Sequence, residues 1–237
     1  MTAEWRHLVM LNYAVEPSLL RPFVPAGTEL DSWRGNTVVS LVGFLFANTR
    51  LLGVPIPWHR TFEEVNLRLY VRRSVEGEVR RAVTFIRELV PRPLIAFVAR
   101  LAYNEPYQAL PMRHQFGALR SDGAPATVEY GWQLPAGWAG MSVQSTGAGR
   151  TAELGSQEEF ITEHYWGYTK QRDGSTVEYR VEHPAWRVWS VHAPLLAGDM
   201  SPLYGKEFAH ILRGPPASAF LADGSAVTVY APSRLAK

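Results

Sequence analysis

The chain has 237 residues, of which 46% are hydrophobic and 19% are charged, and its formal net charge is +2. This length suits one globular domain over residues 1–237 with a sizeable core. The small net charge gives no support to nucleic-acid binding, and the absence of cysteine excludes disulfides, thiolate catalysis and Cys-ligated metals. The longest apolar stretch, residues 38–47, is well short of the roughly 20 residues of a membrane helix. The start of the chain also has no apolar segment of signal-peptide length, so we expect a cytoplasmic protein that does not enter a membrane.

Hydrophobic patterning in the first half of the chain predicts long strands with one or two helices. The expected strands cover residues 7–13, 37–47, 64–73 and 79–89. A short helix is expected over residues 16–23, because Pro17 suits a first helical turn. A second helix is expected over residues 93–103, where apolar residues recur at helical spacing. Residues 51–58 are rich in Gly and Pro and predict a loop.

The second half of the chain continues this pattern with shorter elements. The expected strands cover residues 112–119, 126–133, 168–170, 176–182, 186–192 and 226–230. Residues 135–149 are rich in glycine and weakly patterned, so we predict no element there. Ser156 and Glu159 form a capping box that predicts a helix through about Tyr165. Residues 202–212 favour either a weak helix or a loop.

Many strands joined by short turns, with two or three helices between them, indicate a β-rich α+β fold with an antiparallel sheet. Closure into a barrel or a sandwich would remove exposed strand edges. No internal repeat, linker or low-complexity tract interrupts the chain.

The strand that begins at Glu64 has the most informative pattern in the sequence. Five polar residues alternate with four apolar ones, and successive side chains of a strand point to opposite faces. The polar series is Glu64, Asn66, Arg68, Tyr70 and Arg72. Two interpretations follow: this face is covered by water, or it lines an internal cavity and forms a binding site.

Several familiar motifs are absent from the sequence. No glycine-rich phosphate loop and no G-x-S-x-G elbow occur, so neither nucleotide binding nor a serine hydrolase of that type is supported. The seven histidines form neither H-x-H nor H-E-x-x-H, so we expect no metal site and no cofactor.

Several segments together resemble a known family over most of the chain. These segments are Trp5 with residues 11–13, residues 24–25 with 30–31, residues 42–44, residues 64–71, residues 104–107, residues 160–165 with 168–169, and residues 183–186. Their order and spacing resemble the uncharacterised YqjF-like family, which is similar in fold to the acetoacetate decarboxylase superfamily. The resemblance implies an antiparallel β-barrel or cone with a few peripheral helices and a buried, partly polar cavity.

The resemblance also indicates what this chain lacks. A decarboxylase of that superfamily forms a Schiff base through one of two adjacent lysines, and Tyr107 and Gln108 stand at the similar positions here. An arginine that follows a tyrosine near the decarboxylase N-terminus is replaced by Ala14. The cavity acid has a likeness in Glu64. The three lysines of the chain lie elsewhere, so Schiff-base chemistry is not expected; they are Lys170, Lys206 and Lys237.

These observations lead to a site hypothesis with two functional alternatives. The expected catalytic residues are Glu64, as a proton donor or acceptor, and Tyr107. The expected ligand-binding residues are Asn66, Arg68, Tyr70, Asn104 and Arg113. The first alternative is a lysine-independent, lyase-like enzyme that acts by acid–base chemistry on a carboxylate- or carbonyl-bearing compound, with Arg68 as an anion clamp. The second is a non-catalytic ligand-binding or sensing protein on the same scaffold. The expected partner is a small molecule, and assembly into a homo-oligomer stays open.

Overall fold

The computed structural model describes residues 1–51, 53–55, 60–93 and 104–235. Within these residues, fifteen strands join one sheet. They are β1 (Thr2–Ala14), β2 (Glu29–Leu30), β3 (Val38–Leu51), β4 (Val54–Pro55), β5 (Phe62–Val75), β6 (Glu78–Val90), β7 (Tyr107–Ala109), β8 (Met112–Phe116), β9 (Thr127–Leu134), β10 (Gly137–Thr151), β11 (Trp166–Lys170), β12 (Thr176–Glu182), β13 (Arg187–Ala197), β14 (Ser218–Val229) and β15 (Ser233–Arg234). The helices are α1 (Pro17–Leu20), the 3-10 turn η1 (Arg21–Phe23), α3 (Gln157–Thr162) and α4 (Ser201–Arg213). None of the described helices is long and apolar enough to cross a membrane.

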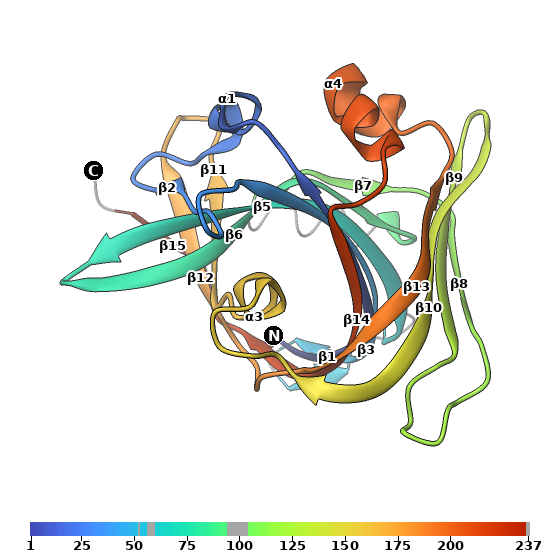
Figure 1. The fold of residues 1–237 in the computed structure, drawn as a ribbon. Helices are drawn as coiled ribbons and strands as arrows, with labels where there is room; N and C mark the ends of the chain where they lie inside the picture. The colour runs from blue at the N-terminus through green and yellow to red at the C-terminus, as the bar shows by residue number, and fades with distance from the viewer. Residues whose placement is uncertain (52, 56–59, 94–103, 236–237) are drawn as a thin grey trace.

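The sheet curves into a ring (Figure 1). The hydrogen-bonded order β12-β11-β6-β5-β3-β1-β14 returns to its start, because β12 also pairs with β14. Most neighbours are antiparallel, but β6 pairs in parallel with both β11 and β7. The sheet is therefore mixed and ring-shaped, which differs in these two pairings from the antiparallel barrel that the sequence predicts.

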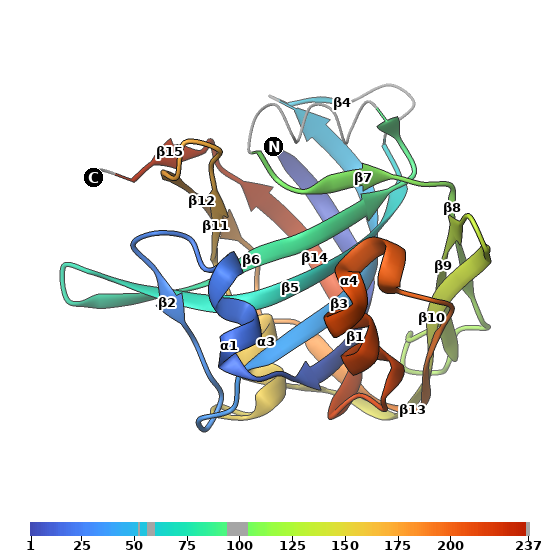
Figure 2. The ribbon, with the colours of Figure 1, turned by 90° about the horizontal axis from the view of Figure 1, so that it is seen from above.

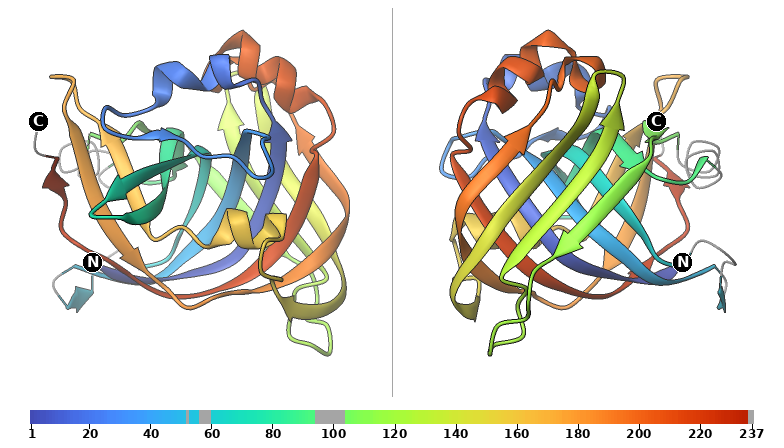
Figure 3. Two further views of the ribbon diagram at one scale, coloured as in Figure 1. Left: turned by 60° about the vertical axis from the view of Figure 1, so that its left-hand side comes forward. Right: turned by 90° about the vertical axis from the view of Figure 1, so that its right-hand side faces the viewer.

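The two faces of the ring bury different apolar clusters. Inside the ring, the short helix α3 contributes Phe160 and Ile161 to a cluster with Met10, Val42 and Phe44. On the opposite face, α4 and the strands β9 and β10 pack against residues such as Leu11 and Leu67. Figures 2 and 3 show α1 and α4 on the outside of the ring and β8 to β10 wrapped along one flank. Both faces of the sheet are therefore buried. The polar series of β5 lies on the face that α3 covers.

Most predicted elements are present, with shifted ends. The predicted strands near residues 7, 37, 64 and 79 are β1, β3, β5 and β6, and β3 lies between β1 and β5. The helix predicted over residues 93–103 lies outside the described residues except for Pro93. The prediction of no element over residues 135–149 is wrong, because β10 runs from Gly137 to Thr151. A Cβ at Gly140 would come within 2.8 Å of the Tyr130 carbonyl oxygen, so glycine permits a close strand approach there.

Two other elements are longer or shorter than the sequence indicates. The last long strand, β14, begins at Ser218 rather than at residue 226, since its polar residues obscure the alternation. The capped helix α3 ends at Thr162 instead of continuing to Tyr165. Its predicted N-cap is confirmed, because the Ser156 hydroxyl accepts a hydrogen bond from the Glu159 amide at 3.1 Å. Residues 202–212 form a helix, α4, which is kinked at Gly205 (φ 79°).

Candidate functional site

The polar face of β5 points into the ring and away from water from Glu64 to Tyr70, whereas Arg72 at its end is exposed and pairs with Glu29. Glu64 and Asn66 each keep 3% of their accessible surface, Arg68 keeps 9% and Tyr70 keeps 1%. A solvent-covered face would leave long charged side chains largely exposed. The structure therefore agrees with the interpretation in which this face of the strand lies in the interior of the ring.

Glu64 lies at the centre of a hydrogen-bonded group. Its carboxylate accepts a bond from the Asn66 amide at 3.0 Å and one from the Tyr107 hydroxyl at 3.1 Å. The sheet register places Glu88 of β6 opposite Asn66, and the parallel strand β7 places Tyr107 beside Glu88. Because cross-strand partners on one face have Cβ atoms about 5 Å apart, these pairings gather three polar side chains around Glu64.

Three carboxyl groups in this region titrate abnormally. Burial raises the pKa of Glu64 to about 8 against the lowering effects of Asn66 and Tyr107. Burial, with the nearby charges of Glu105 and Glu64, raises the pKa of Glu88 well above its usual range. Burial raises the pKa of Glu105 to about 7, although the Tyr179 hydroxyl donates to its carboxylate at 2.5 Å. The cluster can therefore hold and exchange protons near neutral pH.

Arg68 is a buried cation without a carboxylate partner among the described residues. Its Nη2 donates to the Ile161 carbonyl at 3.0 Å, and its Nε makes a weak 3.4 Å contact with the Tyr70 hydroxyl. No ion pair joins it to any described acid, and residues 52, 56–59 and 94–103 contain no Asp or Glu. Since a buried charge is costly unless it is paired, this guanidinium is suited to receive an anion.

A chain of short hydrogen bonds orients Tyr70 and extends across four strands. The Tyr70 and Ser40 hydroxyls lie 2.5 Å apart, and the Ser40 hydroxyl donates to the Asn12 side chain at 2.6 Å. The Asn12 amide donates in turn to the Ser218 hydroxyl at 3.0 Å. Asn12 and Ser40 are fully buried, so this network fixes the polar end of the interior on β1, β3, β5 and β14.

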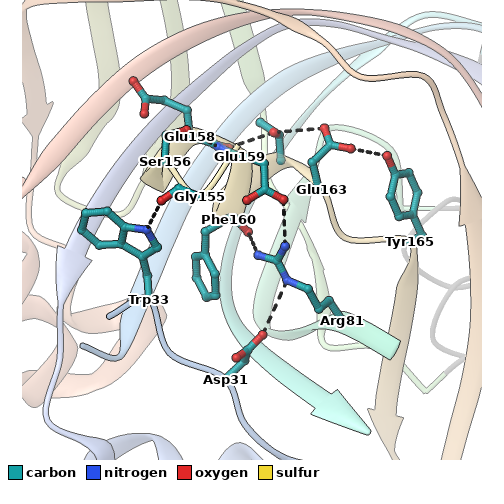
Figure 4. Close-up of polar contacts among 11 residues, drawn as sticks. Asp31, Trp33, Arg81, Gly155, Ser156, Glu158, Glu159, Phe160, Glu163 and Tyr165 are labelled. Carbon is teal, nitrogen blue, oxygen red and sulfur yellow. Dashed lines mark hydrogen bonds and ion pairs between the residues drawn. The ribbon is translucent and has the colours of Figure 1, made fainter. Parts of the chain in front are cut away.

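Helix α3 closes the interior from one side and is held in place by charged contacts (Figure 4). Arg81 of β6 donates to the Glu159 carboxylate and to the Phe160 carbonyl, both at 3.0 Å, and its Nε lies 3.7 Å from Asp31. The Trp33 indole also donates to the Gly155 carbonyl at 3.1 Å. Through these contacts, α3 presents its last carbonyl groups to two arginines, the partly exposed Arg81 and the buried Arg68.

The structure assembles most, but not all, of the predicted site residues. Glu64, Asn66, Arg68, Tyr70 and Tyr107 share the interior, as described above. Asn104 instead donates to the Lys170 carbonyl at 3.0 Å. Arg113 is exposed on β8 and stacks over the Trp138 ring at 4.2 Å. Two surface hollows, of about 690 and 530 Å³, lie at α1 and at α4, and none of these residues lines them.

Sequence reasoning did not assign several interior residues to the site, among them Glu88, Glu105 and His164. Glu88 lies in β6. The pairing of β6 with β5 shifts its register between Leu67 and Arg68 of β5, so alternation along β6 does not show which of its side chains point inward. His164 follows α3 and is 7% exposed, with its ring 4.8 Å from that of Tyr70. The patterning of residues 79–89 could have marked Glu88 as a polar residue in an apolar strand, whereas no sequence signal places His164 inside the ring.

Comparison with known proteins identifies the family. The model of DUF2071, described as an uncharacterized conserved protein family, matches residues 2–226. The chain belongs to the DUF2071 family. One relative of the chain is the uncharacterized protein YqjF of Bacillus subtilis (strain 168), which is 26% identical over 213 residues, or 86% of this chain and 81% of the relative.

Solved structures show which fold this DUF2071 chain shares. The enduracididine biosynthesis enzyme MppR, complexed with pyruvate, aligns with a TM-score of 0.66 at 13% identity, covering 99% of this chain and 90% of MppR. The acetoacetate decarboxylase of Legionella pneumophila aligns with a TM-score of 0.65 at 13% identity, covering 99% and 87%. An acetoacetate decarboxylase-like enzyme of Sphingomonas wittichii RW1 gives 0.66 at 12% identity, covering 99% and 92%. The DUF2071 chain therefore has an acetoacetate decarboxylase-like fold, as the sequence resemblance implies.

Proposed function

We propose that the ring interior binds a small organic acid and that Glu64 transfers a proton to or from it, with Arg68 holding the acid's carboxylate. The observation that carries this proposal is the buried Arg68 guanidinium, which has no described carboxylate partner. A ligand carboxylate would supply the missing charge in the fork geometry that arginine favours. Lyase-like, lysine-independent chemistry on a carbonyl-bearing acid is the reaction class that these groups suit.

The spacing of the two residues sets the size of the ligand. Four residues along a strand span about 13 Å between the Cα atoms of Glu64 and Arg68. Both side chains point into the interior, and we take a short acid of a few carbon atoms as the ligand that both can reach. Glu64, with its pKa of about 8, retains a proton at neutral pH and can donate it or, once ionised, accept one. Tyr107 donates to the same carboxylate and holds its orientation.

A protein of similar fold also supports the proposed ligand class. One solved neighbour, MppR, has been crystallised with pyruvate, a three-carbon carbonyl acid. We nevertheless expect a reaction that differs from a lysine mechanism. Lys170 and Lys206 are exposed, on β11 and α4, and Tyr107 and Gln108 lie on β7 beside Glu88 and Leu89.

The first experiment measures binding with pyruvate as the probe. We expect calorimetric titration to give saturable binding to the wild-type protein and a loss of at least about thirtyfold in affinity for Arg68→Gln, since removal of a buried charge partner typically costs about 2 kcal/mol or more. Arg113→Gln is the matched control, because Arg113 is exposed on β8. Equal affinities for wild type and Arg68→Gln would refute the anion clamp.

A second experiment separates an enzyme from a binder. A general base beside a bound carbonyl acid should exchange the methyl protons of pyruvate for deuterium in D2O, which proton NMR detects. If the protein is an enzyme, Glu64→Gln abolishes this exchange and keeps pyruvate affinity. If wild type binds pyruvate without exchange, the non-catalytic binding or sensing function is favoured. The exposure of Lys170 and Lys206, away from the buried Arg68, motivates that second candidate.

The Schiff-base alternative has its own test. Borohydride reduction in the presence of pyruvate, followed by mass spectrometry of the peptides that contain Lys170 and Lys206, should give no adduct. An adduct on either lysine would overturn the lysine-independent mechanism.

A further inference from the structure

His164 is a buried polar side chain of the ring interior, and both of its hydrogen-bonding nitrogens are unused by the described residues. The residue is 7% exposed, and neither ring nitrogen makes a hydrogen bond with any described residue. The Ile161 carbonyl lies near the ring but outside hydrogen-bonding geometry, and this carbonyl already accepts from Arg68. A buried polar group left without a partner costs about 1–3 kcal/mol, so an orphaned imidazole requires an explanation.

The position of this imidazole is fixed by its neighbours. Its ring lies 4.8 Å from the Tyr70 ring and 5.5 Å from the Phe160 ring, the latter in an edge-to-face arrangement. The His164 amide also donates to the Thr162 carbonyl at 3.1 Å, which ties the residue to the end of α3. Two aromatic contacts and a backbone bond therefore hold an unused hydrogen-bonding group in one orientation, which is the arrangement expected of a preorganised binding residue.

His164 also lies next to the proposed anion clamp. Arg68 has its guanidinium carbon 5.5 Å from the centre of the Tyr70 ring, the same ring that His164 contacts. Burial, followed by the charges of Arg81 and Arg68, lowers the pKa of His164 well below its usual range. The imidazole is therefore neutral at physiological pH, with one nitrogen that donates and one that accepts.

We propose that His164 is a second ligand-binding residue of this site and hydrogen-bonds an oxygen on the carbon next to the carboxylate that Arg68 holds. The inference rests on the proposed carboxylate site and adds the class of acid that the site selects. A hydroxyl or carbonyl oxygen can pair with the neutral imidazole, whereas a plain hydrocarbon chain leaves it unpaired. The site should thus prefer 2-hydroxy and 2-oxo acids to unsubstituted acids of the same length.

The test compares three-carbon acids that differ only at this position. Dissociation constants of propanoate, lactate and pyruvate are measured by calorimetry for wild type, His164→Phe and His114→Phe. Phenylalanine keeps the aromatic contacts to Tyr70 and Phe160 and removes both nitrogens. His114 is the matched control, because it lies on β8 at 34% side-chain exposure and pairs with Glu63.

We expect wild type and His114→Phe to bind lactate or pyruvate about tenfold more tightly than propanoate, as one buried hydrogen bond predicts. In His164→Phe this preference should fall below about twofold while propanoate affinity stays unchanged. A merely structural role would weaken all three acids together. His164→Gln, which restores a donor and an acceptor, should recover part of the preference, and it serves as the second variant if His164→Phe does not fold.

Two outcomes overturn the inference in different ways. A folded His164→Phe protein that keeps the wild-type preference shows that His164 does not contact the ligand, while the Arg68 site stands. Failure of wild type to bind any of the three acids refutes the proposed carboxylate site, and the role of His164 with it.

Discussion

Replacement of Glu64 by glutamine should make the stability of the protein less dependent on pH. The folded state raises the pKa of Glu64 from 4.5 to about 8 because the carboxylate is buried. Between these two values the folded state holds a proton that the unfolded state has released, so stability falls as pH rises through this window. A shift of this size corresponds to roughly 5 kcal/mol at most, at about 1.4 kcal/mol per pKa unit.

Urea denaturation at pH values from 5 to 8.5 measures this effect. We expect the free energy of unfolding of wild type to decrease across the range, and that of Glu64→Gln to decrease by up to about 1.4 kcal/mol less per pH unit. The amide keeps the bond from Asn66, and the Tyr107 hydroxyl can reverse its role to accept from it.

Glu63→Gln is the matched control for this substitution. Glu63 is the adjacent residue on the opposite face of β5 and pairs with His114 instead of the buried carboxyls. Glu88 and Glu105 keep part of the slope in both variants, because burial also raises their pKa values. If Glu64→Gln and wild type have the same slope, Glu64 is not a buried proton-binding group and the reasoning fails.

Three further predictions concern the framework around the site. Ser156→Ala should lower the free energy of unfolding by about 1 kcal/mol, since it removes the N-cap of α3, and chemical denaturation measures this loss. Arg81→Gln should speed hydrogen exchange of the amides of residues 157–162, measured by mass spectrometry, while Arg150→Gln, which removes only the exposed pair with Glu158, should change it little. Gly224→Ala should destabilise the fold by several kcal/mol in thermal denaturation, because the new Cβ would lie 2.0 Å from the Trp5 carbonyl oxygen. Gly123 also has a positive φ but has no neighbour within 4 Å, so Gly123→Ala should lower the stability much less.

The strand content of the fold could be predicted because β5 alternates over a long stretch, whereas β1 and β3 contain continuous apolar runs typical of buried strands. The closure of the ring could not be predicted, because it depends on which strand edges pair with each other. The parallel pairing of Trp166 with Ala82 is a contact between residues far apart in sequence, and no local pattern specifies it. The strand β10 was missed for a related reason. Its glycines carry no side-chain alternation, yet Gly140 is needed because a Cβ there would come within 2.8 Å of the Tyr130 carbonyl oxygen on the neighbouring strand β9.

The residues of the candidate site also differ in whether a local sequence pattern could predict them. Glu64, Asn66, Arg68 and Tyr70 could be predicted as a group, because one strand displays them at a spacing of two residues. The alternation alone could not decide which way they face. Residues contributed by other elements, such as Asn12 and His164, join the interior only through the fold. Arg113, which sequence reasoning added from another strand, lies on β8 over Trp138 instead.

The seam that closes the ring has a consequence for folding kinetics. Only two residue pairs, Val181 with Val229 and Glu182 with Thr228, join β12 to β14, and two pairs join β6 to β11. The strand β1 pairs along almost its whole length with β14, more than 200 residues later. Such long-range contacts carry a large entropic cost of loop closure, so we expect slow folding. The ring can close only after β14 has paired with β1. During synthesis the edge of β1 that β14 will cover stays unpaired until the chain has grown past residue 229, which makes this edge the place where misfolding and aggregation should begin.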